Sequence, residues 1–128
     1  MRDVCDRWRV PVACRELAEV VAREHGNIHR SGEFNAAAIQ RLLDRCDAWR
    51  RPERFADALL ACECDARGRL GMEDDAYPQR PRLLAALAAA QAIDAAAIAA
   101  RAVERGLNGP AIGAAVNEAR VKAIAEAI

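Results

Sequence analysis

The sequence predicts an all-α protein, an irregular bundle of five or six helices with no sheet. Much of the hydrophobic content is alanine and only 4% of residues are aromatic, a composition typical of helices that pack closely through small side chains. No segment alternates apolar and polar residues with β-branched enrichment, so no strand is expected. Helix start and stop signals recur instead along the 128 residues, enough for one domain or two small subdomains.

The first helix is expected from Pro11 to Glu24. Proline suits the first turn of a helix, where its missing N–H costs no hydrogen bond. Gly26 is the expected stop, since glycine is favoured just past a helix end. The buried stripe, spaced at i, i+3, i+4 and i+7, is predicted to comprise Cys14, Leu17, Ala18 and Val21.

A second helix is expected to begin after Asn35, whose side chain can accept a hydrogen bond from a free backbone amide of the first turn. Phe34 and Ile39 stand at hydrophobic-staple positions around this cap. The helix is predicted to end at Arg51, because the residue before Pro52 is disfavoured in the α region. Its buried face is predicted to comprise Ile39, Leu42, Leu43, Cys46 and Trp49.

Pro52 opens the third predicted helix and Gly68 ends it. Phe55, Leu59 and Cys62 are expected to share its buried face. The acidic, turn-rich stretch GRLGMEDDAYP that follows is typical of a loop.

The fourth helix is expected at roughly Pro81 to Ala92, and the fifth follows with Asp94 as its N-cap. Ile93 and Ile98 again occupy staple positions, and Gly106 is the expected end. The apolar face of the fourth helix is predicted to comprise Leu83, Leu84 and Leu87.

The last helix is predicted to open at Pro110, after the tight link GLNGPAIG, and to continue to Ile128. Gly113 inside it costs roughly 1 kcal/mol relative to alanine. We attribute this glycine to close helix packing rather than to a ligand contact. The apolar positions of the helix are Ile112, Val116, Ile124 and Ile128.

Charge and cysteine content limit the partners and the cellular compartment that can be expected for the protein. The formal net charge is +0, so any basic patch for nucleic acid must be local. No run of about 18 apolar residues is present, so no membrane contact is expected. The sequence has five cysteines and no recognisable secretory signal segment. We therefore expect reduced thiols and a cytoplasmic location.

His25 and His29 are the two histidines of the chain, and their i, i+4 spacing is that of a helical metal pair. Gly26 and Asn27 between them argue against a continuous helix. The plainer interpretation is a helix end that carries two polar histidines.

Two further pairs are weaker candidates for a metal site. Cys62 and Cys64 are two residues apart and match no second Cys or His pair, so zinc is not expected. Cys62 is predicted to lie in the core and Cys64 to be partly exposed. Glu63 and Asp65 diverge by about 200° on a helix, which disfavours a shared proton or metal.

Arginines gather at the two ends of the third helix. Arg50, Arg51 and Arg54 lie around its start, and Arg67 and Arg69 around its end. A helix N-terminus offers amides and positive partial charge, so the end with Arg50, Arg51 and Arg54 is a candidate phosphate site. Guanidinium groups match phosphate oxygens, so the arginines at both ends are candidate RNA-binding residues. The alternative is ion pairing along the same helix with Glu53, Asp57, Glu63 and Asp65.

The stretch DAWRRPERFADALLACECDARGR, residues 47–69, resembles the C-terminal half of bacterial multifunctional CCA proteins, the CCA-adding tRNA nucleotidyltransferases with an HD domain. Three more segments support the resemblance, in the order of the family and over nearly the whole chain. They are VPVACRELAEVVAREHGNIHR, EDDAYPQ and GLNGPAIGAAVNEARVKAIA.

The resemblance implies a fragment of a longer protein that forms one compact unit. Residues 1–70 would be the trailing part of the HD region with body helices, and residues 71–128 the C-terminal helical tail region. The full enzyme adds CCA to tRNA 3′ ends, with Mg²⁺, CTP and ATP held by a head and neck that match no segment here. No cofactor and no catalytic residue are expected for this chain alone, and the implied partner is tRNA.

The resemblance also places the histidines in an HD phosphohydrolase region. His25 and His29 match its H…HR segment, and Asp65 falls where a late acid of that region sits. All three would be metal candidates only in a complete domain, because the adjacent His-Asp dyad of the family is absent from this sequence.

The function expected from the resemblance is tRNA holding and architectural support for CCA addition and repair. The alternative, from a different class, is a helical protein-interaction or dimerisation module without an RNA role. The two are distinguished by whether the arginines share one exposed face, or are ion-paired while apolar helix faces lie bare.

Overall fold

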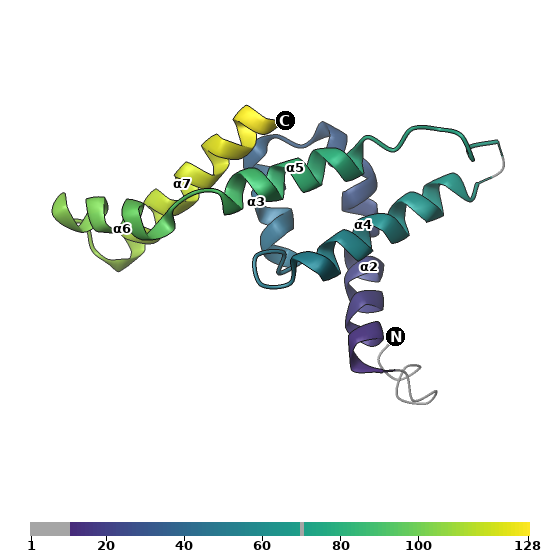
Figure 1. Ribbon diagram of the computed structural model, residues 1–128, viewed down its shortest axis with the longest axis horizontal. Helices are drawn as coiled ribbons and strands as arrows, with labels where there is room; N and C mark the ends of the chain where they lie inside the picture. Colours follow the sequence, from purple (N-terminus) through teal and green to yellow (C-terminus); the bar gives the residue numbers. More distant parts are fainter. Residues whose placement is uncertain (1–10, 70) are drawn as a thin grey trace.

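A computed structural model describes residues 11–69 and 71–128. The all-α prediction is confirmed, because these residues form six α-helices and a short 3-10 turn, with no strand among them (Figure 1). In chain order the elements are α2 (Val12–Arg30), η1 (Ser31–Glu33), α3 (Ala36–Arg45), α4 (Pro52–Arg67), α5 (Gln79–Gln91), α6 (Ala95–Glu104) and α7 (Gly109–Ala127).

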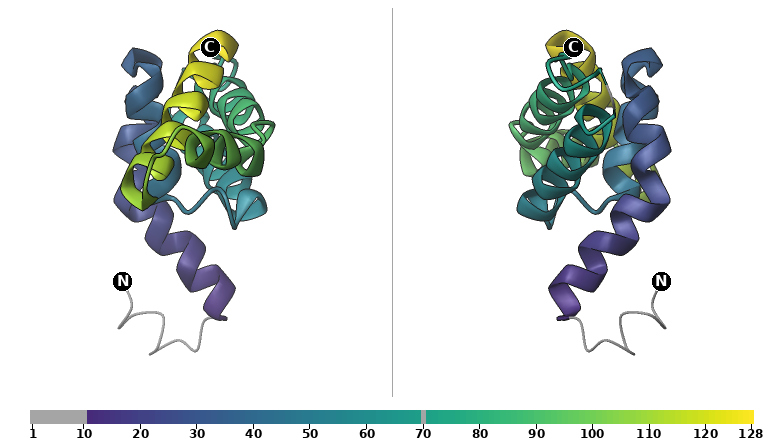
Figure 2. Two further views of the ribbon diagram at one scale, coloured as in Figure 1. Left: turned by 90° about the vertical axis from the view of Figure 1, so that its left-hand side faces the viewer. Right: turned by 90° about the vertical axis from the view of Figure 1, so that its right-hand side faces the viewer.

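The core lies where the C-terminal half of α2 meets α3, α4, α5 and the end of α7. The N-terminal half of α2 projects away from this bundle, and α6 with the start of α7 extends beyond it on another side (Figures 1 and 2). The largest fully buried apolar side chains are Phe55, Ile28, Ile39, Leu42, Leu43, Leu59, Leu83 and Ile124.

The predicted end of the first helix at Gly26 is wrong, since α2 continues to Arg30. Ile28 in the added turn is fully buried. Burying an isoleucine is worth about 1.5 to 3 kcal/mol, more than the roughly 1 kcal/mol that a mid-helix glycine costs.

The predicted buried stripe of this helix is correct only in part, because Leu17 and Val21 pack against the core but no residue of the stripe is fully buried. Cys14 is exposed, and Leu17, Ala18 and Val21 are half-buried. The buried positions of α2 are instead Val20, Glu24 and Ile28, spaced by four residues. Sequence periodicity did not identify this face, because its middle position is the charged residue Glu24.

The second helix is correct at its start and too long at its end. Asn35 caps α3 by accepting a hydrogen bond from the amide of Ala38 at 2.9 Å. The helix ends at Arg45, and residues 46–50 form a turn in which Asp47 has a φ of 52°. This turn buries Ala48 completely, and α4 then begins at Pro52.

The remaining boundaries agree closely with the sequence. α4 ends at Arg67 with Gly68 as its C-cap, and α5 starts two residues earlier than expected, at Gln79. Asp94 caps α6, because its carboxylate accepts from the amide of Ala97 at 3.0 Å. Gly106 follows the helix with a φ of 80°, a left-handed conformation that glycine adopts without a steric penalty.

The packing explanation for Gly113 is wrong. A β-carbon built on this residue of α7 meets no atom within 4 Å. Within the described ranges the glycine therefore lies on an open surface, where no neighbouring helix requires its small size.

No single helix in the described ranges is both long and apolar enough to cross a membrane, although α5 and α6 together reach that length and composition across a 47° bend.

Candidate functional site

Both histidines lie on α2, so the objection that Gly26 and Asn27 would interrupt the helix is wrong. Their ring centroids are 6.2 Å apart, edge to face. His25 Nδ1 lies 3.1 Å from the carbonyl of Val21, one turn earlier in the same helix. This ring nitrogen therefore forms its hydrogen bond within α2.

His29 joins two distant segments of the chain. Its Nε2 lies 3.2 Å from Asp65 Oδ2 at the end of α4, and its Nδ1 lies 2.9 Å from the hydroxyl of Tyr77, just before α5. A neutral imidazole protonated at Nε2 satisfies both contacts, because it donates to the carboxylate and accepts from the phenol. Burial, with a smaller contribution from Cys62, raises the pKa of Tyr77, so the phenol stays protonated as the donor.

The structure thus brings together His25, His29 and Asp65, which the resemblance marked as HD-region candidates. Even so, residues 11–69 and 71–128 contain no group of three or more His, Cys, Asp or Glu side chains placed to hold one metal ion. A metal-site role for these residues in a complete HD region stays a prediction.

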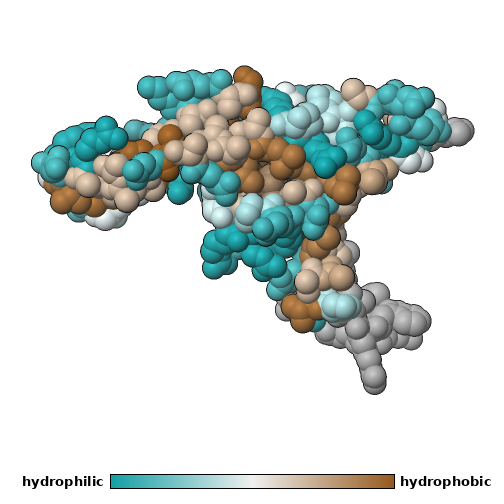
Figure 3. Space-filling model, viewed as in Figure 1, coloured by the Kyte–Doolittle hydropathy of each residue, from teal (hydrophilic) through white to brown (hydrophobic). Residues whose placement is uncertain are grey.

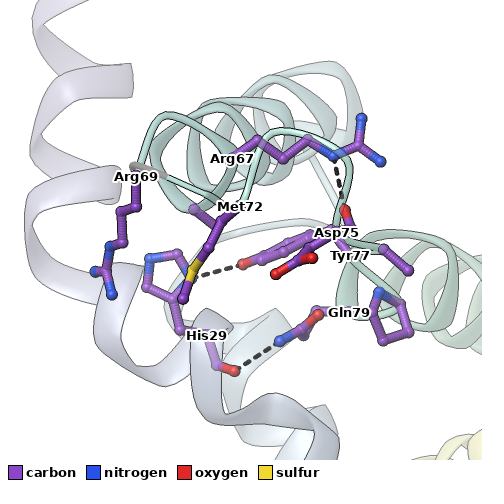
Figure 4. A pocket seen from close by; sticks show the side chains of 10 residues that line it. His29, Arg67, Arg69, Met72, Asp75, Tyr77 and Gln79 are labelled. Carbon is purple, nitrogen blue, oxygen red and sulfur yellow. Dashed lines mark hydrogen bonds between the residues drawn. The ribbon is translucent and has the colours of Figure 1, made fainter.

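A pocket of about 320 Å³ lies beside His29, under the loop between α4 and α5 (Figure 4). Arg67 Nε donates to the carbonyl of Asp75 at 3.1 Å, and Gln79 Nε2 donates to the carbonyl of His29 at 2.9 Å. The first bond holds the acidic loop against the end of α4, and the second joins the start of α5 to α2. Tyr77, the loop residue that reaches His29, was not singled out from the sequence, although it lies in the quoted segment EDDAYPQ.

The arginines at the start of α4 are largely ion-paired. Arg50 Nη2 lies 2.8 Å from Asp47 Oδ2, and hydrogen bonding to this guanidinium lowers the pKa of Asp47. Glu16 on α2 lies 3.4 Å from Arg51 and 3.6 Å from Arg54. Phosphate binding at this end of α4 therefore competes with carboxylates already in place.

The arginines at the other end of α4 differ from each other. Arg67 lies 3.7 Å from Glu63 Oε1. The exposed Arg69 lines the pocket beside His29, and its side chain has no ion pair or hydrogen bond to any described residue. The two arginine groups are separated by the 16 residues of α4, about 24 Å of helix, so they do not form one compact patch.

Apart from the exposed Cys14, the described cysteines are placed as predicted. The four that the structure describes are free thiols, with Cys62 buried and Cys64 exposed. Burial raises the pKa of the Cys62 thiol to about 11, so this thiol stays protonated near neutral pH. Glu63 pairs with Arg80 at 3.0 Å, whereas Asp65 contacts His29, so the two acids serve different partners.

Comparison with known proteins agrees with the resemblance. The chain is 69% identical over 122 residues to the multifunctional CCA protein of Variovorax paradoxus (strain S110), which covers 95% of this chain and 29% of that protein. This chain is related to the C-terminal part of the multifunctional CCA proteins. The CCA protein of Polaromonas naphthalenivorans (strain CJ2) is 64% identical over 124 residues, or 97% of this chain and 29% of the relative.

The CCA protein of Cupriavidus pinatubonensis is 63% identical over 124 residues, 97% of this chain. The chain thus spans 29% of the length of these CCA proteins. No protein-family profile matches the chain. No solved structure matches it either.

Proposed function

We propose that this chain is the tRNA-binding and architectural C-terminal region of a CCA-adding tRNA nucleotidyltransferase. The observation that carries the proposal is the 60 to 69% identity, over 93 to 98% of the chain, to proteins named multifunctional CCA protein. In such an enzyme the substrate is tRNA, and Mg²⁺, CTP and ATP serve a catalytic part outside the segment that this chain matches.

RNA contact requires cations that are free to meet phosphates. Among the arginines predicted from the sequence, Arg69 has this property in the described structure. Arg50, Arg51 and Arg54 would have to exchange a carboxylate partner for a phosphate. Their contribution to RNA binding stays a proposal. Because they are already ion-paired, that contribution is expected to be small.

The chain is expected to bind tRNA without extending it. Nucleotidyl transfer needs metal-bound carboxylates and a nucleotide pocket, which the resemblance assigns to the head and neck of the full enzyme. Purified chain is incubated with tRNA that lacks CCA, labelled CTP and ATP, and Mg²⁺, and then analysed on native and denaturing gels. A shifted tRNA with no label above the protein-free control is the expected result. Incorporated label, or an unshifted tRNA with folded protein, would contradict the proposal.

A second candidate function, self-association, is favoured by one feature of α2. A groove of about 470 Å³ along its projecting half is lined only by small or apolar side chains (tan and brown in Figure 3). They are Cys14, Leu17, Ala18, Val21 and Ala22 of α2, with Ala61 of α4. The groove runs along a helix, so the same surface of a second copy of the chain can pack against it in a symmetric dimer.

The dimer candidate predicts a concentration-dependent increase in mass that Leu17→Lys abolishes. Leu60→Lys is the matched control, because Leu60 is already 42% exposed on α4 and lies outside the groove. Light scattering after size exclusion measures the mass of all three proteins. A monomer at every concentration for the unsubstituted chain would eliminate this candidate and leave the tRNA proposal.

A further inference from the structure

The cationic side chains in the described ranges differ in whether they have a partner. Many of those on α2, α3, α4 and α5 contact a carboxylate or a carbonyl, as Arg45 does with Glu24 at 2.8 Å. Arg101, Arg105 and Lys122 are exposed and have no ion pair or side-chain hydrogen bond to any described residue. These three cations all belong to α6, its C-cap, or α7.

These cations surround one groove of about 520 Å³ between α6 and α7, here called the α6–α7 groove. Arg101 and Arg105 stand one helical turn apart on one wall, and Lys122 lies on the other. Alanines line the groove between them, namely Ala102, Ala115 and Ala119. Small side chains leave room for a bulky backbone to approach the three cations.

The position of the groove also makes it accessible. α6 packs chiefly on α7, and the pair extends past α3 and α5 at one end of the molecule (Figure 1). Hydrophilic residues cover much of this end in the space-filling view (teal in Figure 3). The α6 wall of the groove, with Arg101 and Arg105, is therefore open to an extended ligand.

Two acids moderate the charge of the groove. Glu104 and Glu118 line it together with the three cations. Neither acid forms an ion pair within 4.0 Å with a described cation. The groove is thus weakly positive, with its cations unneutralised by direct contact, and its attraction for a polyanion is expected to be moderate and screened by salt.

We propose that the α6–α7 groove holds phosphates of an RNA backbone, with Arg101, Arg105 and Lys122 as the contacting cations. The inference rests on the proposed function, because the relation to CCA proteins supplies RNA as the polyanion. It differs from the sequence-based expectation, which placed these contacts on the ends of α4. The groove cations bind a phosphate without breaking an ion pair, whereas Arg50 must first leave Asp47.

The test replaces Arg101, Arg105 and Lys122 together with alanine in the intact chain and titrates fluorescent tRNA by anisotropy at several salt concentrations. Each lost phosphate contact removes about 0.7 to 0.9 from the slope of log affinity against log salt. The triple variant is expected to lose about 2 to 3 in slope and to bind at least about tenfold more weakly at low salt. Circular dichroism checks that α6 and α7 remain folded.

Three single variants separate a local contact from a general charge effect. Arg105→Ala is compared with Arg41→Ala, because Arg41 is also exposed, has no ion pair or side-chain hydrogen bond to any described residue, and lies away from the groove on α3. Only Arg105→Ala is expected to reduce the slope. Glu118→Gln is expected to tighten binding about twofold or more, since it removes an acid from the groove. A substitution that acted only by loosening the packing of α7 would not tighten RNA binding.

The outcomes also separate the two levels of proposal. If the unsubstituted chain binds tRNA but the triple variant binds equally well, the groove assignment is overturned and the tRNA proposal stands. If the folded chain binds no tRNA, both are overturned. If the folded chain binds polyglutamate as tightly as it binds tRNA at the same salt concentration, the groove is a site for acidic polypeptides and the RNA assignment is wrong.

Discussion

Replacing Phe55 with alanine is expected to lower the free energy of unfolding by about 3 to 5 kcal/mol, the usual cost of emptying a buried aromatic site. Phe55 has 0% exposure in the core and is one of only two phenylalanines in the chain. It lies in the same buried cluster as Ile39, Leu59 and Leu83, so its removal leaves a cavity in the closely packed centre of the fold. Urea unfolding followed by circular dichroism measures the change.

Leu60→Ala is the matched control for Phe55. It removes an apolar side chain from the same helix at a position 42% exposed, and it is expected to change the stability by roughly 0.5 kcal/mol or less. A loss below about 1 kcal/mol for Phe55→Ala would show that α4 does not pack into the core as described.

Replacing Arg45 with alanine is expected to destabilise the fold by roughly 2 kcal/mol. Its partner Glu24 is 2% exposed and accepts from Arg45 Nε at 2.8 and 3.3 Å. Loss of the partner of a buried charge costs about 3 to 5 kcal/mol. The value expected here is smaller, because Arg45 is 43% exposed and Asn27 still donates to Glu24 at 3.1 Å.

Glu24→Gln supplies the control for the Arg45 prediction. With glutamine at position 24 there is no buried charge to leave unpaired. Adding Arg45→Ala is then expected to lower the free energy of unfolding by about 1 kcal/mol or less. Equal costs in the two backgrounds, measured by urea unfolding, would mean that the ion pair contributes nothing and that Arg45 acts through packing alone.

Local signals in the sequence predicted the helix starts well. Asn35 and Asp94 each cap a helix with their own side chain, and Pro52 opens α4. Such contacts join residues three or fewer positions apart, so they can be inferred without knowledge of the fold. The end at Gly26 failed because the burial of Ile28 depends on helices that follow later in the chain.

The candidate site was predictable only in part, for the same reason. Ion pairing of the α4 arginines was foreseen as the alternative, and one of the four acids named as partners, Glu63, does pair with Arg67. The acid that meets Arg51 and Arg54 is Glu16 on α2, which precedes Arg51 by 35 positions in the sequence. No spacing rule links residues at that separation.

The histidine cluster shows the same limit. The i, i+4 spacing correctly placed His25 and His29 on one side of a helix. The contact of His29 with Tyr77 spans 48 positions and requires the loop between α4 and α5 to fold back over α2. Likewise, the pairing of α6 with α7 decides which cations stay free, and composition alone gave no reason to prefer them.

The central claim, that this chain holds tRNA through phosphate contacts, is tested most directly by titrating tRNA with the intact chain at rising salt. We expect measurable binding at low salt, with log affinity falling linearly against log salt at a slope of about −2 to −3, as three phosphate contacts require. A folded chain that shows no binding at low salt, or an affinity that salt leaves unchanged, would contradict it.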